Sequence, residues 1–428
     1  MKKLILGILT ISALAVTSCN SSEADIIVDT CNDGIKNGDE TAIDCGGSCQ
    51  SCSETEDVSG MITSNTTWSK NNVYVLNGKV VVDAGVTLTI EAGTIIKGKE
   101  GTGSLASALI VARGGKLMAE GTADSPIIFT SVKDNIEVGQ TEGTNLGEAD
   151  NGLWGGLIVL GKAKGSFKGD VTEVQIEGIP AGDTFGLYGG DDDNDNSGVL
   201  KYISIRHGGA EIGEGNEING LTLGAVGSGT VVENIEVVAN FDDGVEFFGG
   251  TVSPKNILVW AQGDDGLDID QAYAGTISNS LVIEGDTSDH GLEIDGGEGS
   301  YEGQFTLNNI TLIGNQNTPD GQYNDNRDGA MGHLNNIYAY GFKTASNVEL
   351  DNDGVAMNYN EGKLTFGTWE IVLPTGVTDV KSLFQNKAET VTVQGFGDNA
   401  VAVTKGSETV GADLSVFDWT YANSKSAY

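Results

Sequence analysis

Three segments of the sequence repeat one order of residues: two polar residues, a glycine, an apolar residue, an acid and a second apolar residue. Successive side chains of a strand point to opposite faces. The two apolar residues of each segment therefore share one face, and the acid between them points the other way. Carboxylates can transfer protons and can bind hard cations such as Ca²⁺. The segments are 242–247 (Asp-Asp-Gly-Val-Glu-Phe), 264–269 (Asp-Asp-Gly-Leu-Asp-Ile) and 289–294 (Asp-His-Gly-Leu-Glu-Ile).

A second repeat indicates how these acids are positioned. Strand-like runs that begin with asparagine recur at intervals typical of solenoids, whose periods are roughly 20–45 residues. No stretch shows sustained helical periodicity. The sequence therefore predicts an all-β fold, a right-handed parallel β-helix over residues 60–428, with the asparagines stacked at one corner and bonding each other's amides. A barrel or sandwich is the alternative, but neither accounts for the recurrence. The runs are 234–238, 256–260, 279–283 and 309–313.

In such a fold the outward acids Glu246, Asp268 and Glu293 stack on neighbouring rungs ~4.8 Å apart. Two like charges at that distance repel by ~3–4 kcal/mol at an effective dielectric near 20. The stack therefore requires a bound cation, raised pKa values or abundant solvent. We interpret the three residues as candidate Ca²⁺ ligands, with a solvated acidic face as the alternative.

The first residues read as an export signal. Lys2 and Lys3 precede the apolar run 4–16, which is too short to span a membrane, so residues 1–18 are predicted to be a signal peptide. Val16-Thr17-Ser18-Cys19 resembles the lipobox of bacterial lipoproteins. The resemblance implies that Cys19 is acylated and anchors the protein to the outer membrane through lipid, with exposure at the cell surface. Residues 19–30 then form a tether.

Four cysteines are confined to residues 31–52: Cys31, Cys45, Cys49 and Cys52. An even number of clustered cysteines in an exported chain predicts two disulfides, with three connectivities open. A zinc site is the alternative. The intervening sequence resembles a short Cys-rich repeat of surface proteins in Bacteroidetes and some other Gram-negative bacteria. Residues 53–59 read as a polar linker.

Composition excludes some classes of function. The chain has 23 Lys and Arg against 61 Asp and Glu, a net charge of −38, which argues against nucleic-acid binding. The excess of acid favours a setting rich in Ca²⁺. Asp191, Asp193 and Asp195 alternate as oxygen ligands do in calcium loops and form a second candidate Ca²⁺ site. No motif indicates an organic cofactor.

Residues 60–428 resemble a recurrent group of β-helix surface lipoproteins of Bacteroidetes. The group implies the fold and the surface location but no particular chemistry. The sequence leaves the oligomeric state open. The phrases that carry the resemblance are 86–98, 121–127 and 154–158, together with 216–224.

A second resemblance concerns the acidic repeats. Segments 240–244, 263–265 and 290–292 resemble the consecutive-rung motifs of polygalacturonase-type β-helix glycosidases. The resemblance implies an inverting mechanism with one carboxyl as acid and another as base. Asp289 replaces a glycine of the motif, and the Arg-Ile-Lys motif is missing, with Arg327 the sole downstream arginine. The implied roles are acid for Asp264 or Asp265, base partner for Asp242 or Asp243, and orienting group for His290.

These observations favour a lipid-anchored surface protein whose acidic, calcium-supported β-helix binds a glycan or another surface protein. A polysaccharide hydrolase or lyase is the alternative, and a structural spacer is a third interpretation. Trp419 is expected to cap the end of the solenoid. Four other tryptophans are expected in the core: Trp68, Trp154, Trp260 and Trp369.

Overall fold

The computed structural model describes residues 31, 36–41, 45–49, 52–177, 179, 182–212, 217–319 and 321–428. The predicted signal peptide, the lipidation site at Cys19 and the tether lie outside the described residues. The chain divides into two compact units, Met1–Cys52 and Ser53–Tyr428. Among the residues described, no helix is both long and apolar enough to cross a membrane.

The first unit contains the two predicted disulfides. Of the three connectivities left open, the structure has Cys31–Cys49 and Cys45–Cys52. All four thiols are therefore oxidised, which removes the ligands that a zinc site would need.

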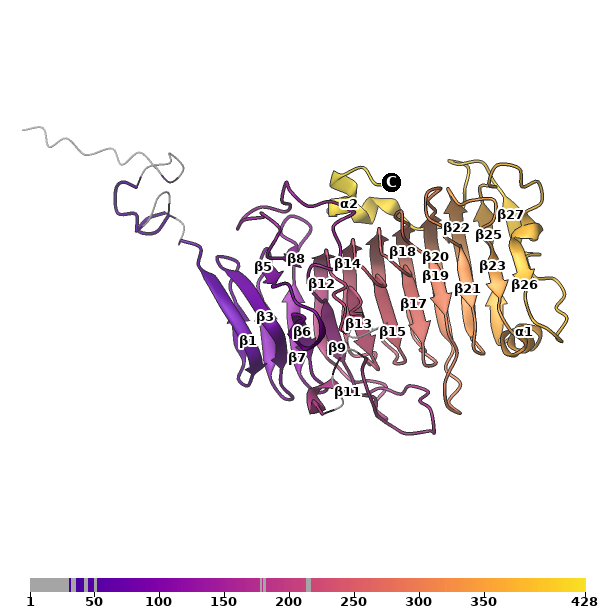
Figure 1. The fold of residues 1–428 in the computed structure, drawn as a ribbon, viewed down its shortest axis with the longest axis horizontal. Coiled ribbons are helices and arrows are strands. Elements are labelled where there is room, and N and C mark those ends of the chain that lie inside the picture. The colour runs from indigo at the N-terminus through magenta and orange to yellow at the C-terminus, as the bar shows by residue number, and fades with distance from the viewer. Residues whose placement is uncertain are drawn as a thin grey trace, which may run out of the picture. The chain divides into compact units, whose positions relative to one another are not determined.

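The second unit is a parallel β-helix, as the repeats predict (Figure 1). Strand pairings divide it into three parallel stacks that enclose one apolar core. Inward-facing residues such as Val245, Phe247 and Leu267 are fully buried.

The first two stacks share long strands that bend between them. The first contains β2 (Thr66–Trp68), β4 (Thr87–Ile90), β7 (Lys116–Glu120), the first parts of β12 (Gly198–Arg206), β14 (Val231–Val238), β16 (Lys255–Trp260), β18 (Thr276–Ile283), β20 (Phe305–Ile313) and β22 (Gly332–Tyr340), and β24 (Leu364–Phe366). The second contains the first parts of β1 (Thr55–Ile62) and β3 (Val73–Val82), then β5 (Ile95–Gly98), β8 (Ile127–Ser131), the later parts of β12 to β22, β25 (Trp369–Ile371) and β27 (Ala400–Ala402).

The third stack carries the acidic repeats. It contains the later parts of β1 and β3, then β6 (Ala108–Val111), β9 (Leu157–Leu160), β13 (Leu221–Gly224), β15 (Val245–Phe248), β17 (Leu267–Asp270), β19 (Leu292–Ile294), β21 (Asn324–Asn326), β23 (Val348–Leu350) and β26 (Phe384–Asn386).

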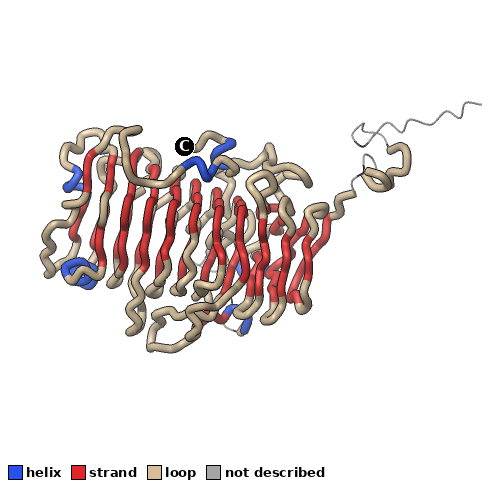
Figure 2. The backbone as a smooth tube through the Cα atoms, turned by 180° about the vertical axis from the view of Figure 1, so that it is seen from behind, coloured by secondary structure: helices blue, strands red, loops and turns tan. Residues whose placement is uncertain are grey.

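The few elements outside the stacks are short, as Figure 2 shows by colour. They are the antiparallel pair β10 (Val174–Gln175) and β11 (Leu187–Tyr188), the helices α1 (Asp353–Asn360) and α2 (Tyr421–Ser424), and the 3₁₀ turns Gly103–Leu105, Thr184–Gly186, Val380–Leu383 and Leu414–Phe417.

The asparagines that begin the repeated runs make the bend between the first two stacks. Asn234, Asn256 and Asn279 have φ values of 56°, 57° and 53°, in the left-handed region that asparagine tolerates better than most residues. Asn256 Nδ2 donates to Asn234 Oδ1 at 2.9 Å, and Asn279 Nδ2 donates to Asn256 Oδ1 at 2.8 Å. The predicted asparagine ladder is confirmed for these rungs.

The expected linker at 53–59 is wrong, because strand β1 begins at Thr55. Residues Thr55 to Val58 pair with Val73 to Leu76 of β3. Their mostly exposed polar side chains gave no apolar pattern to detect, but backbone pairing with the neighbouring rung needs none.

Trp419 does not cap the end of the solenoid. The C-terminal segment runs back along the outer face of the second stack, where Phe417 and Tyr421 pack in one cluster with Trp260 and Leu281. Trp419 lies edge-on to Tyr202 with ring centroids 5.5 Å apart. The placement of α2 beside the middle rungs is visible in Figure 1. The four other tryptophans are all buried: Trp68, Trp154 and Trp369 lie in the apolar core as expected, whereas Trp260 lies on the outer face with the C-terminal segment.

Candidate functional site

The outward acids of the third stack form one column. Strand register places Thr222, Glu246, Asp268, Glu293, Asp325 and Glu349 side by side on successive rungs. The predicted stacking of Glu246, Asp268 and Glu293 is therefore confirmed. Their exposures are only 7%, 8% and 6%, so the alternative of a solvated face is wrong for them. We call the five acids from Glu246 to Glu349 the carboxylate column.

A second set of polar side chains, which we call the turn column, stacks three residues earlier on four of the same rungs. The Asp265 backbone N–H donates to Asp243 Oδ1 at 3.0 Å, and the His290 N–H donates to Asp265 Oδ1 at 2.8 Å. Backbone bonds from Gly220 to Asp243 and from Gly244 to Asp265 fix this alignment. The turn column comprises Asn219, Asp243, Asp265 and His290.

Another part of the chain covers the third stack around β15 and β17 and contributes to this burial. The covering segment, the described residues of 164–190, contains β10 and β11. Its Tyr188 hydroxyl donates to Gln271 Oε1 at 2.7 Å, and its Ile176 packs in one cluster with Phe248 of β15. The alternating pattern of the strands correctly predicted which side chains point outward from the stack. It could not predict that a separate segment buries those outward side chains.

The later rungs of the columns contain cationic side chains. His290 Nδ1 lies 2.8 Å from Asp265 Oδ1 and 3.3 Å from Glu293 Oε2. Arg327 contacts Glu293 and lies 3.0 Å from Asp295 Oδ2. Burial alone would lower the pKa of His290, but the hydrogen bond and charge of Asp265, together with Asp289 and Asp325, raise it to about 9. The imidazole is therefore cationic at neutral pH.

The earlier rungs hold acids alone. Burial, followed by the charges of neighbouring carboxylates, raises the pKa values of Asp243, Glu246 and Asp268 well above their usual range. One oxygen from each of these three side chains lies within 4.8 Å of the other two. Such close acids either share protons or bind a cation.

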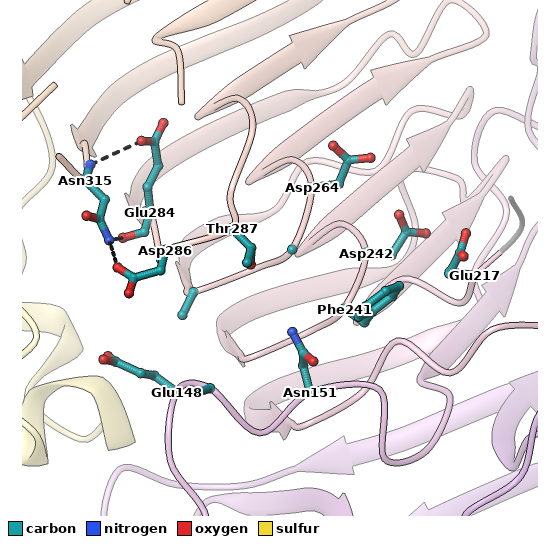
Figure 3. A pocket seen from close by; sticks show the side chains of 14 residues that line it. Glu148, Asn151, Glu217, Phe241, Asp242, Asp264, Glu284, Asp286, Thr287 and Asn315 are labelled. Atoms are coloured by element: carbon teal, nitrogen blue, oxygen red, sulfur yellow. Dashed lines mark hydrogen bonds between the residues drawn. The ribbon is translucent and has the colours of Figure 1, made fainter. Parts of the chain in front are cut away.

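A groove of about 670 Å³ opens beside the turn column. Phe241, which is 50% exposed, and Asp242 lie on one side of it, and Asp286 and Asn315 lie on the other (Figure 3). Asn315 Nδ2 donates to Asp286 Oδ1 at 2.9 Å. The residues that line the groove are Glu148, Ala149, Asn151, Glu217, Phe241, Asp242, Ala261, Gly263, Asp264, Glu284, Gly285, Asp286, Thr287 and Asn315.

Two acids that line the groove, Asp242 and Asp264, have pKa values raised toward neutral pH. Partial removal from water, then the charges of Asp264 and Glu217, raise the pKa of Asp242 to about 7. Partial removal from water and the charges of Asp265 and Asp289 raise the pKa of Asp264 to about 6. Each of these groups can therefore donate or accept a proton, or a hydrogen bond, under physiological conditions.

The structure separates the predicted catalytic set into two layers. Asp242 and Asp264 line the groove, whereas Asp243, Asp265 and His290 are buried beneath it in the turn column. Phe241, which sequence reasoning missed, lies between Asn240 and Asp242. An aromatic residue inside an otherwise polar turn is the sequence feature that could have indicated its exposed position in the groove.

The second candidate Ca²⁺ site is not brought together. Asp191, Asp193 and Asp195 form no carboxylate cluster in the described residues. Asp193 Oδ2 instead lies 2.7 Å from Lys164 Nζ, and Asp195 Oδ2 accepts from the Ser197 hydroxyl at 3.2 Å. Local spacing predicted converging ligands, whereas Asp193 pairs with a lysine from outside the loop and Asp195 with a neighbouring serine.

Comparison with known proteins places the chain by its fold. Residues 60–422 match the family described as pectate-lyase like beta helix domain. The chain therefore belongs to this family of β-helix domains. No curated protein and no solved structure matches it.

Proposed function

We propose that this protein is a lipid-anchored protein of the outer membrane that binds a neutral glycan at the cell surface. The observation that carries the proposal is the groove, in which a half-exposed Phe241 lies beside acids and amides. An aromatic ring offers a flat apolar face to a sugar ring, while a few convergent polar groups fix the ligand's orientation.

The charge of the groove favours a neutral ligand over an anionic one. Its lining contains no Lys, Arg or His among the described residues, and it includes Glu148, Glu217, Asp242, Asp264, Glu284 and Asp286. A uronate carboxylate would meet repulsion there and would find no cation to pair with. Hydroxyl groups can donate to the same carboxylates without that penalty.

Calcium binding is part of the proposal. A chain with a net charge of −38 needs counter-cations, and hard oxygen ligands bind the Ca²⁺ that an extracellular medium supplies. The surface location rests on the lipobox-like Val16–Cys19, and intact-mass analysis of membrane-extracted protein tests it. A mature chain without acyl groups on Cys19 would contradict this part of the proposal.

The ligand proposal is tested by titrating neutral and acidic oligosaccharides into the protein. We expect Phe241→Ala to weaken binding of a neutral oligosaccharide by ~10-fold or more, since a stacked aromatic anchor contributes more than 1 kcal/mol. Leu105→Ala is the matched control, because Leu105 is also exposed, at 73%, but does not line the groove. Equal affinity of the Phe241 variant and the wild type would contradict the glycan site.

Hydrolysis is a second candidate, favoured by the pKa values of about 7 and 6 at Asp242 and Asp264. The geometry argues against the inverting mechanism that the sequence resemblance implied. An oxygen of Asp242 lies within 4.8 Å of one of Asp264, whereas inverting pairs are roughly 6.5–9.5 Å apart to admit water.

Release of reducing ends by the wild type, abolished in Asp264→Asn, would establish the enzyme. Without release or binding of any glycan by the wild type, the spacer interpretation would stand.

A further inference from the structure

One stretch of the two columns holds buried acids without a cationic partner. Asp243, Glu246 and Asp268 have exposures of 6%, 7% and 8% and bring one oxygen each within 4.8 Å of the others. Ion pairs in the described part of the chain include Glu293 and Glu349 of the same carboxylate column but none of these three acids. The missing charge must come from outside the chain or from protons.

Two buried oxygens at this place also have no hydrogen-bond donor. Asp268 Oδ1 is unpartnered, and so is Oδ1 of Asn219, a side chain that is only 1% exposed. The amide of Asn219 lies against the acids, with its Nδ2 donating to Glu246 Oε2, and a 180° turn of the amide would present its Oδ1 to a cation instead. A buried oxygen without a partner costs stability, so native structures rarely keep one unless an ion or water satisfies it.

We propose that Asn219, Asp243, Glu246 and Asp268 hold one Ca²⁺, and we call these four residues the cation cage. All available ligand atoms are oxygens, which a hard cation prefers, and no sulfur or imidazole would favour zinc. Calcium–oxygen distances are ~2.3–2.6 Å, so two ligands of one ion are at most ~5 Å apart, and one oxygen each of Asp243, Glu246 and Asp268 meets this condition.

The cage has a mechanical consequence for the groove. It connects β15 and β17 to the turn that precedes β13, and its Asp243 directly follows the groove residue Asp242. A bound ion would hold these rungs in register and fix the groove floor. The cage would be the site at which the proposed function requires calcium. It rests on that proposed function, because the cell surface is the location that supplies Ca²⁺.

The test compares calcium-stripped and calcium-loaded protein by elemental analysis and thermal melting. Wild type should retain Ca²⁺ after extensive dialysis, melt at lower temperature once stripped, and recover on addition of Ca²⁺. Mg²⁺ should restore less, because it demands a smaller octahedral site. Asp268→Asn should weaken Ca²⁺ binding by at least ~10-fold and abolish the shift in melting temperature.

Glu349→Gln is the matched control, because Glu349 belongs to the same column but pairs with Lys387 at 2.7 Å. It should keep the full calcium shift. Asn219→Ala, which leaves every charge in place, should weaken Ca²⁺ binding even if Asp268→Asn folds poorly.

A stripped wild type that melts identically with and without Ca²⁺, or a shift unchanged in both cage variants, would overturn the cage. Loss of glycan binding in Phe241→Ala with an intact calcium shift concerns the groove alone, so the two proposals fail separately.

Discussion

The two ends of the acidic columns meet the same electrostatic problem in different ways. On the later rungs, His290 and Arg327 lie within ion-pair distance of Asp265, Glu293 and Asp295. On the earlier rungs, no cation among the described residues pairs with Asp243 or Glu246. Strand register and burial are the same at both ends. The fold therefore does not determine where the compensating positive charge comes from. The later rungs obtain it from His290 and Arg327, whereas the earlier rungs can take up cations or protons from solution.

Removing the internal cation should have the largest effect. Arg327→Gln leaves Glu293 and Asp295 without their guanidinium, and breaking a buried pair costs ~3–5 kcal/mol. Because Arg327 itself is 39% exposed, we expect about 3 kcal/mol, measured as a shift of the urea midpoint. Adding Glu293→Gln should restore part of the loss. Lys381→Gln, which breaks an exposed pair with Asp398, is the control; an equal loss in both would mean that the later rungs do not depend on Arg327.

The pH dependence of stability should distinguish the two ends next. Burial and neighbouring acids raise the pKa of Asp270 to about 7 and that of Asp295 to about 8, and His290 titrates at about 9. A pKa raised by folding stabilises the protein at low pH, and this stabilisation is lost as pH rises through the folded value.

Calcium-free protein should therefore lose stability between about pH 5 and pH 9. Added Ca²⁺ should reduce this fall, because it replaces protons on the earlier rungs, and should leave the losses near pH 8 from Asp295 and near pH 9 from His290. Thermal melts across this range check the prediction. A curve that Ca²⁺ leaves unchanged would mean that protons alone compensate the earlier rungs.

The smallest effect is expected at the last rung of the carboxylate column. Lys387 is 45% exposed and pairs with one acid, Glu349, whereas Arg327 contacts both Glu293 and Asp295. Lys387→Gln should therefore cost less than Arg327→Gln, about 1 kcal/mol. A loss as large as that of Arg327→Gln would show that the number of paired acids does not separate these rungs.

Recurring patterns made the fold predictable. The asparagine-led runs predicted the solenoid and the asparagine ladder. The alternation around Glu246 and Asp268 predicted that the acids stack. Each of these features depends on local periodicity. The cover over the columns was not predictable in this way. Residues 164–190 carry no repeat and follow β9, whereas Phe248 in β15 and Gln271 directly after β17 lie two and three rungs further along the stack.

The same distinction applies to the site. Asp242 and Asp264 could be predicted as site residues because they belong to the repeat. The repeat does not show that these two acids line the groove while Asp243 and Asp265 are buried, since that depends on which side of the turn each side chain faces. At 191–195 the spacing predicted converging ligands, whereas Lys164, 29 residues from Asp193 in the sequence, pairs with that acid. Glu148 and Asn151 of the groove wall belong to the long connection between β8 and β9. No sequence pattern predicts the path of this connection.

The returning C-terminal segment has a consequence for how the chain folds. Solenoids usually gain and lose rungs one after another, since each contacts only its neighbours. Here the Ala422 N–H donates to the buried Glu236 Oε1 at 2.8 Å, and the Tyr421 hydroxyl donates to the Leu146 carbonyl at 3.1 Å, across 186 and 275 residues of sequence. During synthesis the flank formed by Leu258 and Leu281 stays uncovered until residues 417–422 have been made. We therefore expect this returning segment to couple the central rungs, so that they unfold together rather than one after another.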